Sequence, residues 1–135
     1  MSMWVHVAAI ARVDGISLFV ERPEEEQYQF ESIFGKECLW GADKFIWDDA
    51  IKNPDKYLPM GSEGPLRMTV WINPKENDMD RYTVSIFGDL RDVCDKQPII
   101  DWFKKKIGQL DMVRQAAITV NDFEGTATWT YDDNG

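Results

Sequence analysis

With 135 residues, 44% of them hydrophobic and 13% aromatic, the chain has enough apolar material for one packed core, and this composition excludes an intrinsically disordered protein. Its formal net charge of −9 disfavours binding to nucleic acid or to an anionic membrane, because both are recognised mainly through Lys and Arg. We therefore predict a single domain over residues 1–135 that has neither a nucleic-acid nor a membrane partner.

The sequence carries no evident targeting segment or transmembrane span. Its first residues lack the basic and apolar blocks of a signal peptide, and no apolar run approaches the ~18 residues that a membrane helix needs. The two cysteines, Cys38 and Cys94, are too far apart for a CxxC motif and too few for a secreted disulfide framework. These features predict a cytoplasmic protein with free thiols.

The first 35 residues combine an apolar run with a helix signal. Trp4–Arg12 has apolar or small side chains on both faces, which is typical of a central strand that is covered on both sides. Asp14 and Gly15 form a turn signal after it. Pro23 and the three glutamates that follow predict a helix start, because proline suits the first helical position and acids complement the helix dipole there. The helix is predicted to end at Gly35.

Residues 36–65 form an irregular segment without sustained periodicity. Its last part, Tyr57–Pro65, contains two prolines and two glycines in nine residues and is therefore predicted to be a loop. Loops of this length are often functional, so position alone makes this loop a candidate location for a site.

Two alternating runs follow the irregular segment. Arg67–Ile72 and Arg81–Phe87 each place apolar and polar side chains at alternate positions, and eight residues connect them. This spacing predicts an antiparallel pair of strands. The polar residues indicate that one side of the pair is partly open, with Trp71 and Phe87 on that side.

An amphipathic helix and a second hairpin complete the predicted elements. Pro98–Leu110 has an apolar stripe opposed by Lys104–Lys106, and Asp95 is its predicted cap. The three lysines fall late in the helix, where its dipole favours cations, and either a solvated face or an anion site explains them. Val113–Asn121 and Thr126–Tyr131 flank a short turn and predict the hairpin.

The order of these elements traces βαββαβ. We therefore predict an α+β, ferredoxin-like sandwich with a mainly antiparallel sheet. Additions to that pattern are an extra C-terminal strand, the long irregular insertion before the second strand, and a frayed tail at residues 132–135. This fold supports many unrelated functions, so it assigns none by itself.

The sequence contains no catalytic constellation that stands out. His6 is the only histidine, and it lies in an apolar strand, which favours a hydrogen-bonded histidine of the core or of a sheet face. One histidine and two separated cysteines argue against zinc. The acids at Asp89, Asp92 and Asp95 follow a strand end and are the best candidates for a Mg²⁺ or Ca²⁺ site, but turn and cap roles also explain them. We predict no catalytic residue, no cofactor and no bound metal, and favour a protein that is not an enzyme.

The leading functional hypothesis is a small interaction module that forms a homodimer or binds a protein partner through an aromatic-rich sheet face. Its basis is the excess of aromatic residues, six Trp, four Tyr and seven Phe, in a chain without catalytic motifs. The candidate interface residues are Trp4, Trp71, Phe87 and Trp129.

Two alternatives come from other functional classes. The first is a small-molecule-binding protein or cofactor-poor enzyme of the dimeric ferredoxin-like type, in which His6 and Trp40 line a pocket between sheet and helices. The second is an acidic inhibitor that mimics DNA and occupies a basic cleft, which requires carboxylates spaced like a phosphate backbone. A closed apolar pocket would favour the first alternative, and ordered rows of carboxylates would favour the second.

Overall fold

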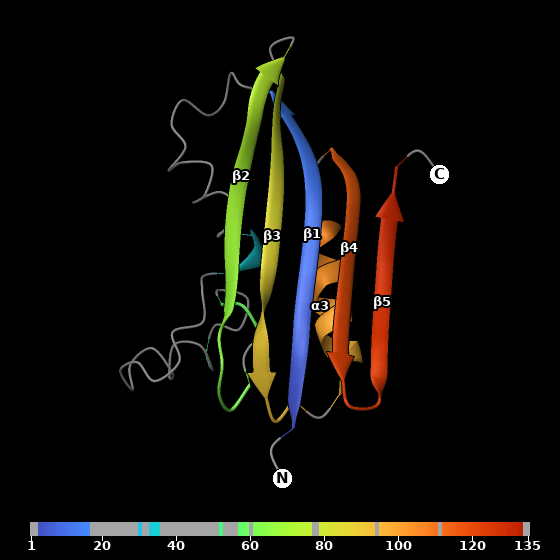
Figure 1. The fold of residues 1–135 in the computed structure, drawn as a ribbon. Coiled ribbons are helices and arrows are strands. Elements are labelled where there is room, and N and C mark those ends of the chain that lie inside the picture. The colour runs from blue at the N-terminus through green and yellow to red at the C-terminus, as the bar shows by residue number, and fades with distance from the viewer. Residues whose placement is uncertain are drawn as a thin grey trace.

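The computed structural model describes residues 3–16, 30, 33–35, 52, 57–59, 61–76, 79–93, 95–110 and 112–133. The elements with defined bounds are, in chain order, β1 (Trp4–Ile16), β2 (Leu66–Glu76), β3 (Met79–Arg91), α3 (Gln97–Ile107), β4 (Val113–Asp122) and β5 (Gly125–Asp132). The five strands form one sheet in the order β2-β3-β1-β4-β5, and every neighbouring pair is antiparallel (Figure 1).

Strand β1 lies at the centre of the sheet, as its sequence predicts. Its odd-numbered side chains from Val5 to Val13 are buried on the face against which α3 packs, which we call the helix face. Its even-numbered side chains from Trp4 to Arg12 are exposed on the other face. The prediction that both faces of this strand are covered is therefore wrong for the side chains that the structure describes. No described helix or strand packs on this second face (Figure 1), which carries the polar side chains of His6 and Arg12.

Both predicted hairpins are confirmed. In the first, β2 pairs with β3, so that Trp71 lies opposite Thr83 and Arg67 opposite Phe87. In the second, β4 pairs with β5, from the pair of Asp122 and Gly125 next to the loop to the pair of Gln115 and Asp132. Gly125, the first residue of β5 after the two-residue loop, has a φ of 139°, a backbone conformation that L-residues rarely adopt.

Helix α3 packs against β4 and β5 with the apolar stripe that its periodicity predicts (Figure 1). Phe103 lies at the centre of this contact, and its ring centroid is 6.2 Å from that of Phe34 and 6.0 Å from that of Trp129. Lys96 rather than Asp95 occupies the N-cap position, although the Asp95 carboxylate accepts a hydrogen bond from the Gln97 N–H.

The three lysines of α3 do not form one solvated face. Lys104 and Lys105 are exposed, but Lys106 retains only 3% of its accessible surface. Lys106 follows Phe103 by three positions, and residues three apart share a helix face, so this lysine joins the buried stripe.

The predicted α+β, ferredoxin-like βαββαβ sandwich is wrong. The molecule is mostly a five-stranded antiparallel sheet, and α3 is the one helix with defined bounds in the part of the chain that the structure describes. Much of the helix predicted from Pro23 and of the irregular segment 36–65 lies outside the described residues. Of these regions, Phe30, Phe34 and Leu58 are described and buried in the core.

The strands are longer than their local signals indicate. The turn signal at Asp14 and Gly15 does not end β1, because these residues remain paired with Arg81 and Asp80 of β3. Cooperative pairing between two strands of 13 residues thus overrides a local turn preference, and the sheet becomes the dominant element.

A polar contact fixes the start of α3 to the second hairpin. Lys96 Nζ donates to Asp122 Oδ1 at 2.7 Å and to the Gly125 carbonyl at 3.4 Å. The hydrogen bond from Lys96 is the main cause that lowers the pKa of the Asp122 carboxyl, and backbone N–H donors assist it. The contact therefore couples the position of α3 to that of β5.

No helix among the described residues is long and apolar enough to cross a membrane.

Replacement of the central core residue tests this packing. Phe103→Ala is expected to lower the free energy of unfolding by about 3–5 kcal/mol, because it removes a fully buried ring and leaves a cavity. Urea denaturation followed by circular dichroism measures the change. Lys105→Ala, at an exposed position of the same helix, serves as the control and is expected to stay within about 0.5 kcal/mol of the wild type.

The Lys96–Asp122 contact predicts a specific dependence of stability on pH. Because the pKa of Asp122 is lower in the folded than in the unfolded chain, its carboxylate stabilises the fold above the unfolded pKa. This contribution is lost as the pH falls through the folded pKa. Asp122→Asn should therefore be less stable than the wild type at neutral pH, and the two should converge in acid. Urea denaturation across a pH series measures both, with Asp101→Asn correcting for the loss of one negative charge.

Candidate functional site

One broad face of the sheet is the candidate site, and we call it the open face. It consists of the side chains of Trp4, His6, Ala8, Ile10 and Arg12 on β1 and of the residues opposite them on the neighbouring strands, which alternate with buried residues. Figure 1 views the molecule from this side, with α3 behind the sheet. No described helix or strand packs on this face.

Large apolar side chains are exposed across the β1, β2 and β3 part of the open face. Trp71 is 60% exposed, Ile10 48%, Phe87 46% and Trp4 39%. Phe87 lies opposite Ala8 of β1 on one side and Arg67 of β2 on the other. Three of the four predicted interface residues, Trp4, Trp71 and Phe87, therefore lie on the same face.

Trp129 does not lie with them. Its ring packs on Phe103 at a centroid distance of 6.0 Å, and Lys104 Nζ lies 5.9 Å from its centroid, so this tryptophan belongs to the helix face. The hairpin register explains the difference, because Trp129 is paired with the buried Ile118. In the sequence, the alternation of side chains in Val113–Asn121 indicates which face Ile118 occupies, and therefore which face its hairpin partner Trp129 occupies.

A cluster of arginines occupies one end of the open face. Arg12, Arg81 and Arg114, with Asp14 and Gln115, line an open hollow of about 260 Å³. Arg114 Nε donates to the buried Asp14 carboxylate, and this bond is the main cause that raises the pKa of Arg114. Arg12 and Arg81 form no ion pair with another described residue. Local sequence patterns do not reveal this cluster, because its three arginines come from three different strands and are brought together only by the register of the sheet.

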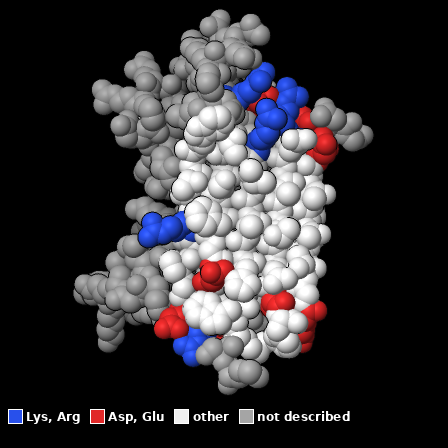
Figure 2. All heavy atoms as spheres, viewed as in Figure 1, with Lys and Arg blue, Asp and Glu red and all other residues white. Residues whose placement is uncertain are grey.

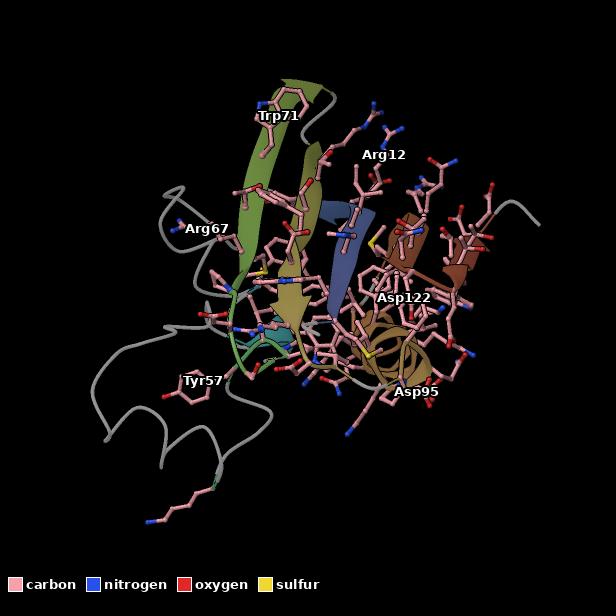
Figure 3. All side chains as sticks on the ribbon, turned by 60° about the horizontal axis from the view of Figure 1, so that its bottom comes forward. Arg12, Tyr57, Arg67, Trp71, Asp95 and Asp122 are labelled. Atoms are coloured by element: carbon pink, nitrogen blue, oxygen red, sulfur yellow. The ribbon has the colours of Figure 1, made fainter. Side chains whose placement is uncertain are left out.

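The opposite end of the open face is acidic. His6 Nδ1 lies 2.6 Å from Asp89 Oδ1, and both side chains are more than half exposed. This pair confirms that His6 is a hydrogen-bonded histidine of a sheet face. Figure 2 shows most of the Lys and Arg atoms at the top of the face and most of the Asp and Glu atoms toward the bottom. Smaller blue groups lie at mid-height on the left and at the lower left, and red atoms also lie at the upper right. Figure 3 shows Arg12 and Trp71 at one end of the sheet and Asp95 and Asp122 at the other.

The predicted loop site, Tyr57–Pro65, is described over most of its length. Its Ser62 and Glu63 join the end of β3 through backbone hydrogen bonds to Arg91 of 2.8 and 2.9 Å. The Ser62 hydroxyl donates to Asp92 at 2.7 Å, which is the main cause that lowers the pKa of this carboxyl. These contacts attach the loop to the sheet.

The three acids that the sequence offers for a cation site do not converge, and Asp89 lies within β3 rather than after it. Asp89 contacts His6, Asp92 contacts Ser62, and Asp95 accepts from the Gln97 N–H. Among the described residues, no three side chains of His, Cys, Asp or Glu lie close enough together to hold a metal ion. Trp40, Cys38 and Cys94 lie outside the described residues.

Two larger hollows are also open to solvent. One, of about 380 Å³, lies on the open face around Ile10, Ala117 and Thr130, and the other, of about 480 Å³, lies beside Trp129 on the helix face. Small-molecule sites usually bury most of their ligand, and neither hollow does so.

No family model, no curated protein and no solved structure matches the chain. The function must therefore be inferred from the chemistry of the site itself. The open face offers a wide contact area, exposed aromatic rings, and opposite charges at its two ends. These are the features of a surface that binds another surface.

The exposure of Trp71 predicts that it contributes little to folding. Trp71→Ala is expected to lower the free energy of unfolding by no more than about 2 kcal/mol at low protein concentration, because 60% of the side chain is already in water. Urea denaturation monitored by circular dichroism tests this expectation. A loss of several kcal/mol would show that Trp71 belongs to the core, and Tyr82→Ala, at a buried position of β3, provides the destabilised reference.

Proposed function

We propose that the chain is a protein-interaction module that binds its partner through the open face. The observation that supports this proposal is the exposure of Trp71, Phe87, Ile10 and Trp4 on one face of a five-stranded sheet. Exposed apolar groups in such number on one face are typical of protein interfaces, in which aromatic residues and arginine are enriched. The Arg67 and Arg81 side chains on the same face fit this composition.

The class of partner follows from the charges. A net charge of −9 opposes binding to nucleic acid, and acidic residues such as Asp89 lie on the open face together with its arginines. A DNA mimic needs carboxylates in rows, whereas the row of Ser85, Ile10 and Ala117 across the middle of the open face is uncharged. A protein surface is the partner that this combination favours, and we place the interaction in the cytoplasm.

Site-specific photo-crosslinking in cells that make the protein tests the proposal. A photoreactive benzoylphenylalanine replaces Thr69, which is exposed on the open face opposite Ser85. The control carries the same group at Lys105, which is exposed on α3. We expect ultraviolet light to produce discrete covalent protein adducts from position 69 and none from position 105. Absence of adducts at position 69, or the same adducts at both positions, would contradict the proposal.

A further inference from the structure

We infer that the partner of the open face is a second copy of this chain, docked face to face with its strands antiparallel to those of the first copy. This inference rests on the proposed function and names the partner. It follows from the placement of charge along β3 and from the size of the face.

Strand β3 carries opposite charges at equal distances from its middle. Its open-face side chains from position 81 onward are, in order, Arg81, Thr83, Ser85, Phe87, Asp89 and Arg91. The Arg91 guanidinium is paired with the Glu63 carboxylate at 2.6 Å. Arg81 and Asp89 therefore lie four residues on either side of Ser85. Ser85 is paired with Ile10, which is in turn paired with Ala117, so this row crosses the middle of the face and is uncharged.

A two-fold axis along that row brings the opposite charges together. The axis is perpendicular to the strands, so β3 of one copy lies over β3 of the other and runs the opposite way. Arg81 then faces Asp89 of the second copy, and the same pair forms again by symmetry. Phe87 faces the small side chain of Thr83, and Ile10 meets its own symmetry mate. Stacked sheets lie about 10 Å apart, a gap that an arginine and an aspartate together can bridge.

The charged groups on the face have capacity for these contacts. Arg81 forms no ion pair with another described residue. Asp89 has one carboxylate oxygen 2.6 Å from His6 Nδ1, and an ionised carboxylate accepts more than one donor. Arg12 lies one strand and two residues away from Arg81, so it adds positive potential over the same carboxylate.

Charge also explains why a second copy uses this face. Two chains of net charge −9 repel each other unless their contact surfaces are less acidic than the rest. On the described open face, Arg12 and Arg81 lie at one end and Asp89 lies at the other. Two further arginines of this face are Arg67, opposite Phe87, and Arg91, which is paired with Glu63. When the two copies dock with antiparallel strands, the arginine end of each copy faces the aspartate end of the other. When they dock with parallel strands, arginine faces arginine.

The area of the face suits a stable dimer. Strands lie about 4.8 Å apart and rise about 3.3 Å per residue, so five strands over the span from Asp89 to Arg81 cover about 650 Å². Two such faces bury about 1,300 Å², which lies within the range of specific protein interfaces. Two twisted sheets keep this contact when their strands cross at about 30°.

Charge reversal in mixed samples tests the arrangement. Arg81→Asp places aspartate against aspartate in a homodimer, and Asp89→Arg places arginine against arginine. Each variant alone is therefore expected to dimerise at least about tenfold more weakly than the wild type, because like charges become opposed across the interface. In a mixture, each interface pair again joins arginine to aspartate. We expect native mass spectrometry to show the heterodimer in preference to either homodimer.

Matched controls separate this geometry from a general effect of charge. Lys105→Asp and Asp101→Arg make the same types of reversal at exposed positions of α3, and we expect neither to change dimerisation nor to favour a mixed dimer. The double variant Arg81→Asp/Asp89→Arg is expected to recover the homodimer, which also shows that both substitutions allow folding.

The outcomes distinguish this inference from the proposed function. Single variants that dimerise like the wild type, or a mixture without heterodimer enrichment, would overturn the antiparallel docking of two copies. If position 69 then crosslinks only to other proteins, the open face remains an interaction surface with a different partner. If position 69 crosslinks to nothing, both conclusions fail.

Discussion

The alternation of side chains along β1 is the constraint on which the rest of the structure depends. Successive residues of a strand point to opposite faces. The odd-numbered valines and alanines of β1 are therefore buried in the core, and its even-numbered residues from Trp4 to Arg12 are exposed. The helix face is closed by α3 and by the described aromatic residues Phe30 and Phe34. The same alternation leaves Trp4 and Ile10 in water, and their exposure follows directly from the register that builds the core.

The two faces of the sheet therefore have different roles. The helix face supplies stability through rings that contact one another around Phe103 and through the Lys96–Asp122 contact. The open face adds little to the stability of a single copy, yet it carries Trp71 and Phe87. In the proposed dimer, Ile10, Phe87 and Trp71 supply apolar contact, and the pairing of Arg81 with Asp89 selects the antiparallel orientation.

Local sequence patterns predicted the parts of this structure that depend on local register. Alternation identified both hairpins and placed Trp71 and Phe87 on one side, because side-chain parity within a strand is a local property. The fold class was not predicted, since strand length in this sheet is set by pairing between distant segments, as at Asp14 and Arg81. The arginine cluster could not be predicted for the same reason, and the face that Trp129 occupies is set by its pairing with Ile118 across the hairpin.

The central claim is that the open face joins two copies of the chain, and its most direct test is the mass of the unmodified protein in solution. Size exclusion coupled to light scattering over a concentration series, at low and moderate salt, gives that mass. We predict a rise from the 15.7 kDa of one chain to twice that value, retained at moderate salt because the apolar side chains of Ile10, Phe87 and Trp71 lie in the interface. A mass that stays at 15.7 kDa at every concentration would contradict the account.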